Sequence, residues 1–137
     1  MTAKYLIIAG SLVLLVLGTM HLWYTFFTNR FLARDARTVE KMKKDFPVLT
    51  RRTTMWKAWI GFNASHSSGA MFIGLVNIII ACQYFEIYQK SVSLLLLNDI
   101  TVLFYLFLAK RYWFKIPFTG ICITAICFIV ATGIILF

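Results

Sequence analysis

Charged residues are scarce in this chain, and acidic residues are the scarcest of all. Only 14% of its 137 residues are charged, with five Asp and Glu against 14 Lys and Arg. A soluble globular domain is about a quarter charged. Hydrophobic residues make up 61% of the chain, and its mean hydropathy is +0.80. A chain this apolar could not hide its apolar surface from water, which excludes a soluble globular fold.

Motifs of soluble enzymes and of metal-binding modules are absent as well. The chain has no phosphate-binding glycine loop, no Gly-x-Ser-x-Gly elbow and no His-Glu-x-x-His motif. Cys82, Cys122 and Cys127 form no Cys-x-x-Cys pair, so we interpret them as packing residues. The two histidines are too few for a histidine-rich di-iron membrane enzyme. Whether the protein is an enzyme stays open.

Four long apolar runs predict four membrane-spanning helices. A spanning helix needs about 20 mostly apolar residues. The runs cover residues 5–28, 56–85, 92–109 and 116–137. We therefore predict an all-α integral membrane protein, with residues 1–137 forming one transmembrane domain that is an antiparallel four-helix bundle.

Basic residues gather in the first and third connections between these runs. By the positive-inside rule, both connections are cytoplasmic and both termini lie outside, and we expect a bacterial inner membrane. Only Lys4 and Lys90 lie on the opposite side. Charge placed between apolar runs favours anionic lipid headgroups as the partner and argues against nucleic acid. The basic residues of the two connections are Arg30, Arg34, Arg37, Lys41, Lys43, Lys44, Arg51, Arg52, Lys57, Lys110, Arg111 and Lys115.

Aromatic residues accompany the predicted membrane boundaries, where their amphipathic rings are favoured. Tyr5, Tyr84 and Tyr88 are predicted near the outer boundary. The predicted anchors at the inner boundary are Trp56, Trp59, Tyr112 and Trp113, together with Arg111 and Lys115.

The first connection carries an amphipathic pattern over residues 35–46. Val39, Met42 and Phe46 recur at helical spacing among basic residues. This pattern predicts a short helix lying on the inner membrane surface, with a partner-binding helix as the alternative. Asp35 is expected to cap its start, and Pro47 to stop it. Thr53 or Thr54 is expected to cap the second span.

Three ionisable residues fall inside the predicted spans: His21, His66 and Asp99. A central aspartate costs about 2.5–3.5 kcal/mol on insertion scales, so it should face the bundle interior and have a partner. Counted from the nearest basic residue at about 1.5 Å per residue, the histidines lie about 13 Å deep and Asp99 about 16 Å. These depths are near the midplane of a core about 30 Å thick. We therefore predict a midplane polar site from three helices.

Asn63, Ser67 and Asn98 are the further members of this predicted site. The two histidines could hold haem through both axial positions, or His21, His66 and Asp99 could bind a single metal ion. Without a metal, the site could bind a small molecule, move protons on a lipid-like substrate, or serve proton-coupled transport. A structural hydrogen-bond cluster that only joins the helices is the remaining alternative.

Two segments carry a family resemblance. They are Leu-Gly-Thr-Met-His at residues 17–21 and Met-Trp-Lys-Ala-Trp-Ile-Gly-Phe-Asn-Ala-Ser-His-Ser at residues 55–67. About the first half of the chain thereby resembles an uncharacterised family of small bacterial four-span integral membrane proteins. The resemblance implies a membrane bundle and no activity.

Two function hypotheses follow from the polar residues. In the first, a midplane site binds a small molecule, metal or haem, and an internal cavity should reach His21, His66 and Asp99. In the second, the protein is a structural or accessory subunit that joins a membrane partner or a second copy of itself. Such a subunit should expose a strip of small residues at the level of the lipid and have no enclosed cavity.

Overall fold

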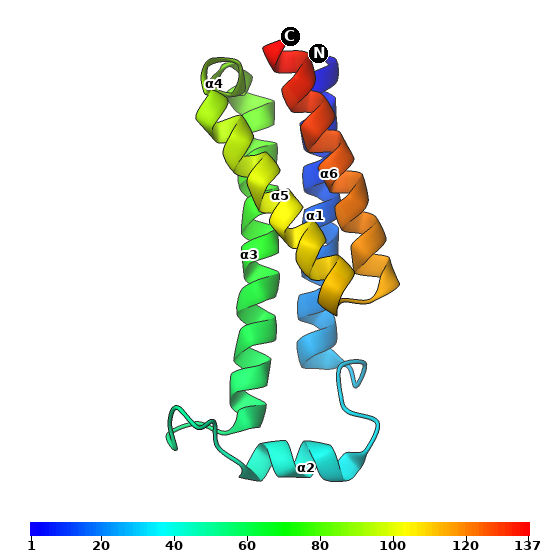
Figure 1. Ribbon diagram of the computed structural model, residues 1–137, viewed down its shortest axis with the longest axis vertical. Coiled ribbons are helices and arrows are strands. Elements are labelled where there is room, and N and C mark those ends of the chain that lie inside the picture. Colours follow the sequence, from blue (N-terminus) through cyan, green and yellow to red (C-terminus); the bar gives the residue numbers. More distant parts are fainter. The chain divides into compact units, whose positions relative to one another are not determined.

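The computed structural model describes residues 1–137, and every regular element in it is a helix (Figure 1). Four helices are long and apolar enough to cross a membrane: α1, α3, α5 and α6. The predicted all-α fold with four spanning helices is therefore confirmed. The elements are α1 (Thr2–Phe27), α2 (Ala36–Lys44), α3 (Met55–Gln83), α4 (Phe85–Lys90), α5 (Val92–Tyr112) and α6 (Lys115–Leu136).

The first connection contains the expected short helix, α2. Asp35 caps its start, because the carboxylate accepts the backbone N–H of Arg37 at 3.1 Å. The helix ends at Lys44 with Asp45 as its C-cap, two residues before Pro47, and no residue of α2 is buried. At the start of α3, Thr54 rather than Thr53 caps the helix, since its hydroxyl accepts the N–H of Lys57 at 3.3 Å.

The connection between the second and third spans differs from the prediction. Backbone angles of −137° and 42° at Tyr84 leave the helical region, so α3 ends at Gln83. Residues 85–90 then form the separate helix α4, whose first residue, Phe85, lies in the predicted second span. Ser91 follows, and its hydroxyl accepts the N–H of Leu94 at 3.3 Å to cap α5.

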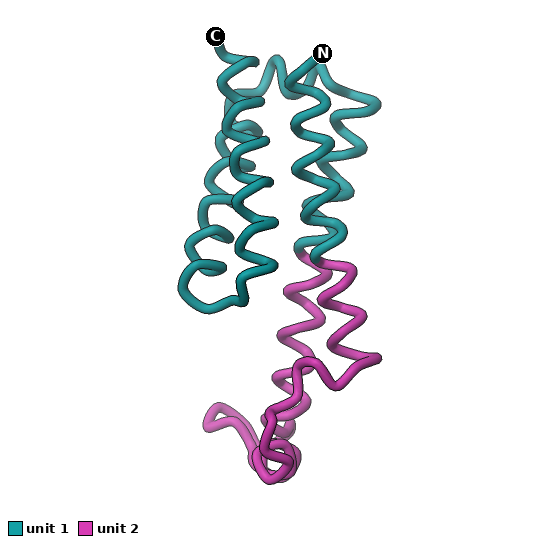
Figure 2. The backbone as a smooth tube through the Cα atoms, turned by 90° about the vertical axis from the view of Figure 1, so that its right-hand side faces the viewer, with its two compact units in different colours: residues 1–17, 70–137 teal, residues 18–69 magenta.

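The chain divides into two compact units, and α1 and α3 contribute residues to both (Figure 2). Unit 1 comprises residues 1–17 and 70–137, and unit 2 comprises residues 18–69. Unit 1 contains the first turns of α1, the second half of α3, and α4, α5 and α6. Both termini lie at the same end of unit 1 (Figure 2). Unit 2 contains the last turns of α1, α2 and the first half of α3.

Small residues bring the helices of unit 1 close together. A Cβ added to Gly74 would lie 2.8 Å from the carbonyl oxygen of Ser11, so α3 and α1 touch backbone to backbone there. Between α1 and α6, the hydroxyl of Thr124 donates to the carbonyl of Gly10 at 3.1 Å.

Other contacts also hold unit 1 together. Lys4 Nζ on α1 donates to the carbonyl of Cys82 near the end of α3, at 3.3 Å. The apolar core includes Ala3, Ile7, Leu14, Ala81, Leu95, Val102, Ile121, Ala125, Phe128 and Ala131.

We predict that Gly74→Ala destabilises the protein by about 1–3 kcal/mol, because the new methyl group meets rigid backbone and forces the helices apart. Gly133→Ala is the matched control, since a Cβ there meets nothing within 4 Å. The control should be neutral or slightly stabilising. Reversible unfolding in mixed micelles measures both, and equal stabilities would contradict the close approach.

Candidate functional site

The two histidines lie together in unit 2. The ring of His21 meets that of His66 edge to face, with centroids 5.5 Å apart. Asn63 joins them, because its Oδ1 lies 2.9 Å from His21 Nε2 while its Nδ2 donates to the carbonyl of Trp59 at 2.8 Å. Ser67 is fully buried and donates to the carbonyl of Asn63 at 2.7 Å. The histidine cluster, His21, Asn63, His66 and Ser67, thus joins α1 to α3.

This network assigns the proton of His21. Because the Asn63 amide nitrogen already donates to Trp59, its oxygen is the acceptor, and His21 Nε2 must carry a hydrogen. Nε2 is then not a lone-pair donor to iron, and rings in edge-to-face contact leave no room for a porphyrin plane between them. A haem held through His21 and His66 would require these two rings to move apart.

Asp99 lies in unit 1 and has its own partners. Its carboxyl interacts with the hydroxyl of Thr132 on α6, and its Oδ1 is enclosed without any hydrogen-bond partner. On α1 its neighbour across a small cavity is Ile7, in the first turns of that helix. The structure therefore shows the histidine cluster and Asp99 with separate sets of partners. No three or more His, Cys, Asp and Glu side chains are grouped to hold a metal ion.

Tyr88 forms a polar contact that the sequence did not predict. We expected this residue near the outer membrane boundary, and in the structure its side chain is fully buried within the protein. Its hydroxyl donates to Asn77 Oδ1, whose amide nitrogen donates to the carbonyl of Ile73 at 2.9 Å. Asn98 also bonds to the Tyr88 hydroxyl. This network joins α3, α4 and α5 through Asn77, Tyr88 and Asn98. The only signal for it in the sequence was an Asn on each of two spans.

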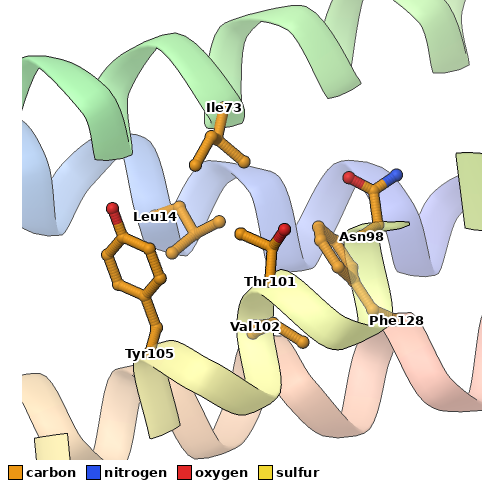
Figure 3. Close-up of a pocket in the computed structure, with 7 residues that line it drawn as sticks. All are labelled: Leu14, Ile73, Asn98, Thr101, Val102, Tyr105 and Phe128. Atoms are coloured by element: carbon orange, nitrogen blue, oxygen red, sulfur yellow. The ribbon is translucent and has the colours of Figure 1, made fainter. Parts of the chain in front are cut away.

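The cavities of unit 1 are very small. One lies between Leu14 and Ile73 on one side and Thr101 and Tyr105 on the other (Figure 3). A second lies beside Asp99 and is also lined by Tyr88, Asn98 and Thr132. Each has a volume of about 10 Å³, which is room for about one water molecule. Neither is lined by His21 or His66, so neither is the predicted cavity that reaches all three ionisable residues.

The predicted inner-boundary anchors divide into two groups. In unit 2, Trp56 stacks on Trp59 with centroids 5.6 Å apart, and the ammonium of Lys43 lies 5.6 Å from the Trp56 ring centroid. In unit 1, Trp113 packs edge to face on Tyr105. Tyr112, Arg111 and Lys115 are exposed, and the Arg111 guanidinium lies over the Tyr112 ring.

One face of α3 in unit 2 exposes small residues. Gly61, Ser65 and Ser68 are spaced by four and three positions, and all three are exposed. A Cβ added to Gly61 would meet nothing within 4 Å. Phe62 borders this small-residue strip and is 75% exposed. The strip belongs to α3, a helix that is long and apolar enough to span a membrane. It is therefore open to lipid or to a helix of another protein.

Comparison of the chain with protein-family models, curated proteins and solved structures finds no match. The class of the protein therefore rests on its fold. Four apolar helices of spanning length make it a multi-pass integral membrane protein.

We predict that Tyr88 ionises far above ordinary tyrosines, because burial raises its pKa from 10.0 to about 12, against a smaller opposing effect of the Asn98 hydrogen bond. The pKa of Tyr88 is higher in the folded state than in the unfolded state. The protonated phenol therefore contributes its full stabilisation of the fold below pH 10, and this contribution is lost as pH rises towards 12. The loss is about 2–3 kcal/mol. Unfolding free energies of wild type and Tyr88→Phe, measured from pH 9 to 12, should converge by that amount. Parallel curves would contradict it.

Proposed function

We propose that this protein is an accessory subunit that assembles with another membrane-spanning protein, and that its polar clusters hold its own helices together. The observation that carries the proposal is the small-residue strip of Gly61, Ser65 and Ser68. It is exposed at a spanning helix, and the two cavities described in unit 1 each have room for only about one water molecule. These are the features that distinguish an accessory subunit from a protein built around a ligand.

The histidine cluster and the Tyr88 network support this proposal because their polar groups bond to one another. His21 donates to Asn63, which donates to the carbonyl of Trp59. Tyr88 donates to Asn77 in the same manner. Interhelical polar bonds of this kind contribute about 0.6 kcal/mol each on average and need no ligand. Their role is then to fix which helix faces pack together.

The small-residue strip suits a partner helix better than it suits lipid. Lipid chains make little van der Waals contact with a shallow surface. A second helix makes more, because small residues let the two backbones approach each other. The Ser65 hydroxyl already donates to the carbonyl of Phe62 at 3.1 Å, so this hydroxyl presents no unsatisfied donor to the hydrocarbon. The partner we infer is therefore an apolar spanning helix with small residues on its own contacting face.

The basic connections support an orientation for the assembly. Twelve of the 14 Lys and Arg residues lie in the first and third connections or at their edges. We propose that these connections face the cytoplasm of a bacterium, with both termini outside the inner membrane and anionic headgroups beside the basic residues.

We predict that Gly61→Leu weakens the complex by about 1–3 kcal/mol through overpacking of its contact face. Gly133→Leu is the matched control, because a Cβ added there also meets nothing within 4 Å. Both variants should unfold at the wild-type temperature. Native mass spectrometry of polymer-excised membrane discs should show the partner with wild type and Gly133→Leu only. A wild-type chain that is always alone, or a complex that survives Gly61→Leu, would overturn the proposal.

A second candidate function, a proton-binding site, rests on Asp99. Its Oδ1 is enclosed and unpartnered beside a cavity with room for one water, and it takes part in no ion pair. Asp99 is also the only acidic residue within a spanning helix. Ionisable residues at such positions commonly serve proton or ion movement. A carboxyl that gains and loses its proton here would require a path for water to this cavity.

We predict that pH-difference infrared spectra of the reconstituted protein contain a carboxyl C=O band from Asp99. The band should vanish in Asp99→Asn, because the amide has the same shape and no titrating proton. Glu86→Gln is the control, since Glu86 lies in α4 outside the spanning helices. A spectrum unchanged by Asp99→Asn would exclude proton exchange at this position.

A further inference from the structure

A loop in unit 2 holds two apolar side chains away from the rest of the protein. Residues 45–55, here called the tip loop, follow α2 and lead into α3. Leu49 is 94% exposed, Val48 is fully exposed, and Phe46 is 51% exposed. Uncovered apolar side chains standing next to one another in a structured loop are a common mark of an interaction surface.

The tip loop is closed and ordered by its own hydrogen bonds. The N–H of Met55 donates to the carbonyl of Asp45 at 2.9 Å, which joins the two ends of the loop. At the tip, the N–H of Thr50 donates to the carbonyl of Pro47 at 3.1 Å. The Thr50 hydroxyl then accepts the N–H of Arg52 at 3.1 Å. A loop whose ends meet in this way holds its tip in place, and such loops are often functional.

Positive charge surrounds the apolar tip. Lys43 and Lys44 precede it, Arg51 and Arg52 follow it, and all four side chains are exposed. Asp45 is the only acidic residue within the tip loop. Lys43 lies over the Trp56 ring, so an aromatic residue favoured at membrane boundaries stands at the base of the loop.

The rest of unit 2 places this loop at the end of a spanning hairpin. α2 runs crosswise below the ends of α1 and α3 (Figure 1), with Val39 and Met42 half-buried and its basic side chains exposed. The tip loop starts where α2 ends. A crosswise amphipathic helix at the end of spanning helices is the geometry of an element lying in the membrane interface.

We propose that the tip loop is a bilayer anchor that inserts Val48 and Leu49 into the acyl boundary of an anionic leaflet, with Lys43, Lys44, Arg51 and Arg52 on the lipid headgroups. Insertion buries the two apolar side chains, which the rest of the protein leaves exposed. The four basic side chains favour the anionic leaflet. This surface is separate from the small-residue strip of α3, so the inference does not depend on the proposed accessory function.

The test replaces Leu49 by an environment-sensitive fluorescent amino acid in the full chain. The protein is reconstituted into phosphatidylcholine vesicles with and without roughly a third phosphatidylglycerol, each containing spin-labelled quencher lipid. The same probe at Arg34, an exposed position before α2, is the matched control. We expect strong quenching and a blue shift at position 49 with phosphatidylglycerol, and a water-like signal at position 34.

Two variants in the probe-bearing chain separate charge from apolar insertion. Arg51→Gln with Arg52→Gln should lower the inserted fraction by about fivefold for each charge removed. Val48→Ser should lower it by about tenfold. Neither change touches a packed side chain, and an unchanged unfolding temperature verifies that the fold is kept.

Three outcomes would overturn the inference. A water-like probe at position 49 in the anionic vesicles excludes insertion. Equal quenching in both lipid compositions removes the selection of an anionic leaflet. A probe that is quenched in neither vesicle but becomes shielded in native membranes assigns the tip loop to a protein partner instead.

Discussion

The hydrocarbon core of a membrane offers no hydrogen bonds, so every polar group that enters it must find its partner within the protein. That constraint decides the arrangement of this bundle. His21 is joined to Asn63, Tyr88 to Asn77, and Thr124 to the backbone of Gly10. Each bond ties one helix to another, and each is individually weak. Taken together they select which faces meet, while the small residues set how closely they approach.

Length and composition made the elements predictable. A spanning helix must be long and apolar, and caps obey local rules, so the four spans and the Asp35 cap could be read from the chain alone. The break at Tyr84 was less visible, because a helix of six residues leaves little pattern in an already apolar sequence. Local rules therefore gave the helices but missed how two of them are joined.

The polar site was only partly predictable, for a geometric reason. Position along a helix gives depth, but the direction a side chain faces depends on how the helices pack. His21, Asn63, His66 and Ser67 were expected together and lie together. Asp99 has Thr132 as its partner instead, a residue that offered no signal beyond its hydroxyl. Tyr88 was expected near the boundary because tyrosines gather there, and that expectation said nothing of its burial, where an amide oxygen satisfies the phenol.

The bond between Thr124 and Gly10 has a consequence for biogenesis. It joins α1 to α6, and an atom of the Phe128 ring lies 3.0 Å from where a Gly10 Cβ would stand. While the ribosome is still making the middle of the protein, that face of α1 has no neighbour from α6. This contact can therefore form only after α6 has been synthesised. A chain stalled before residue 115 would expose an unfinished surface inside the bilayer, where membrane proteases and chaperones recognise such intermediates.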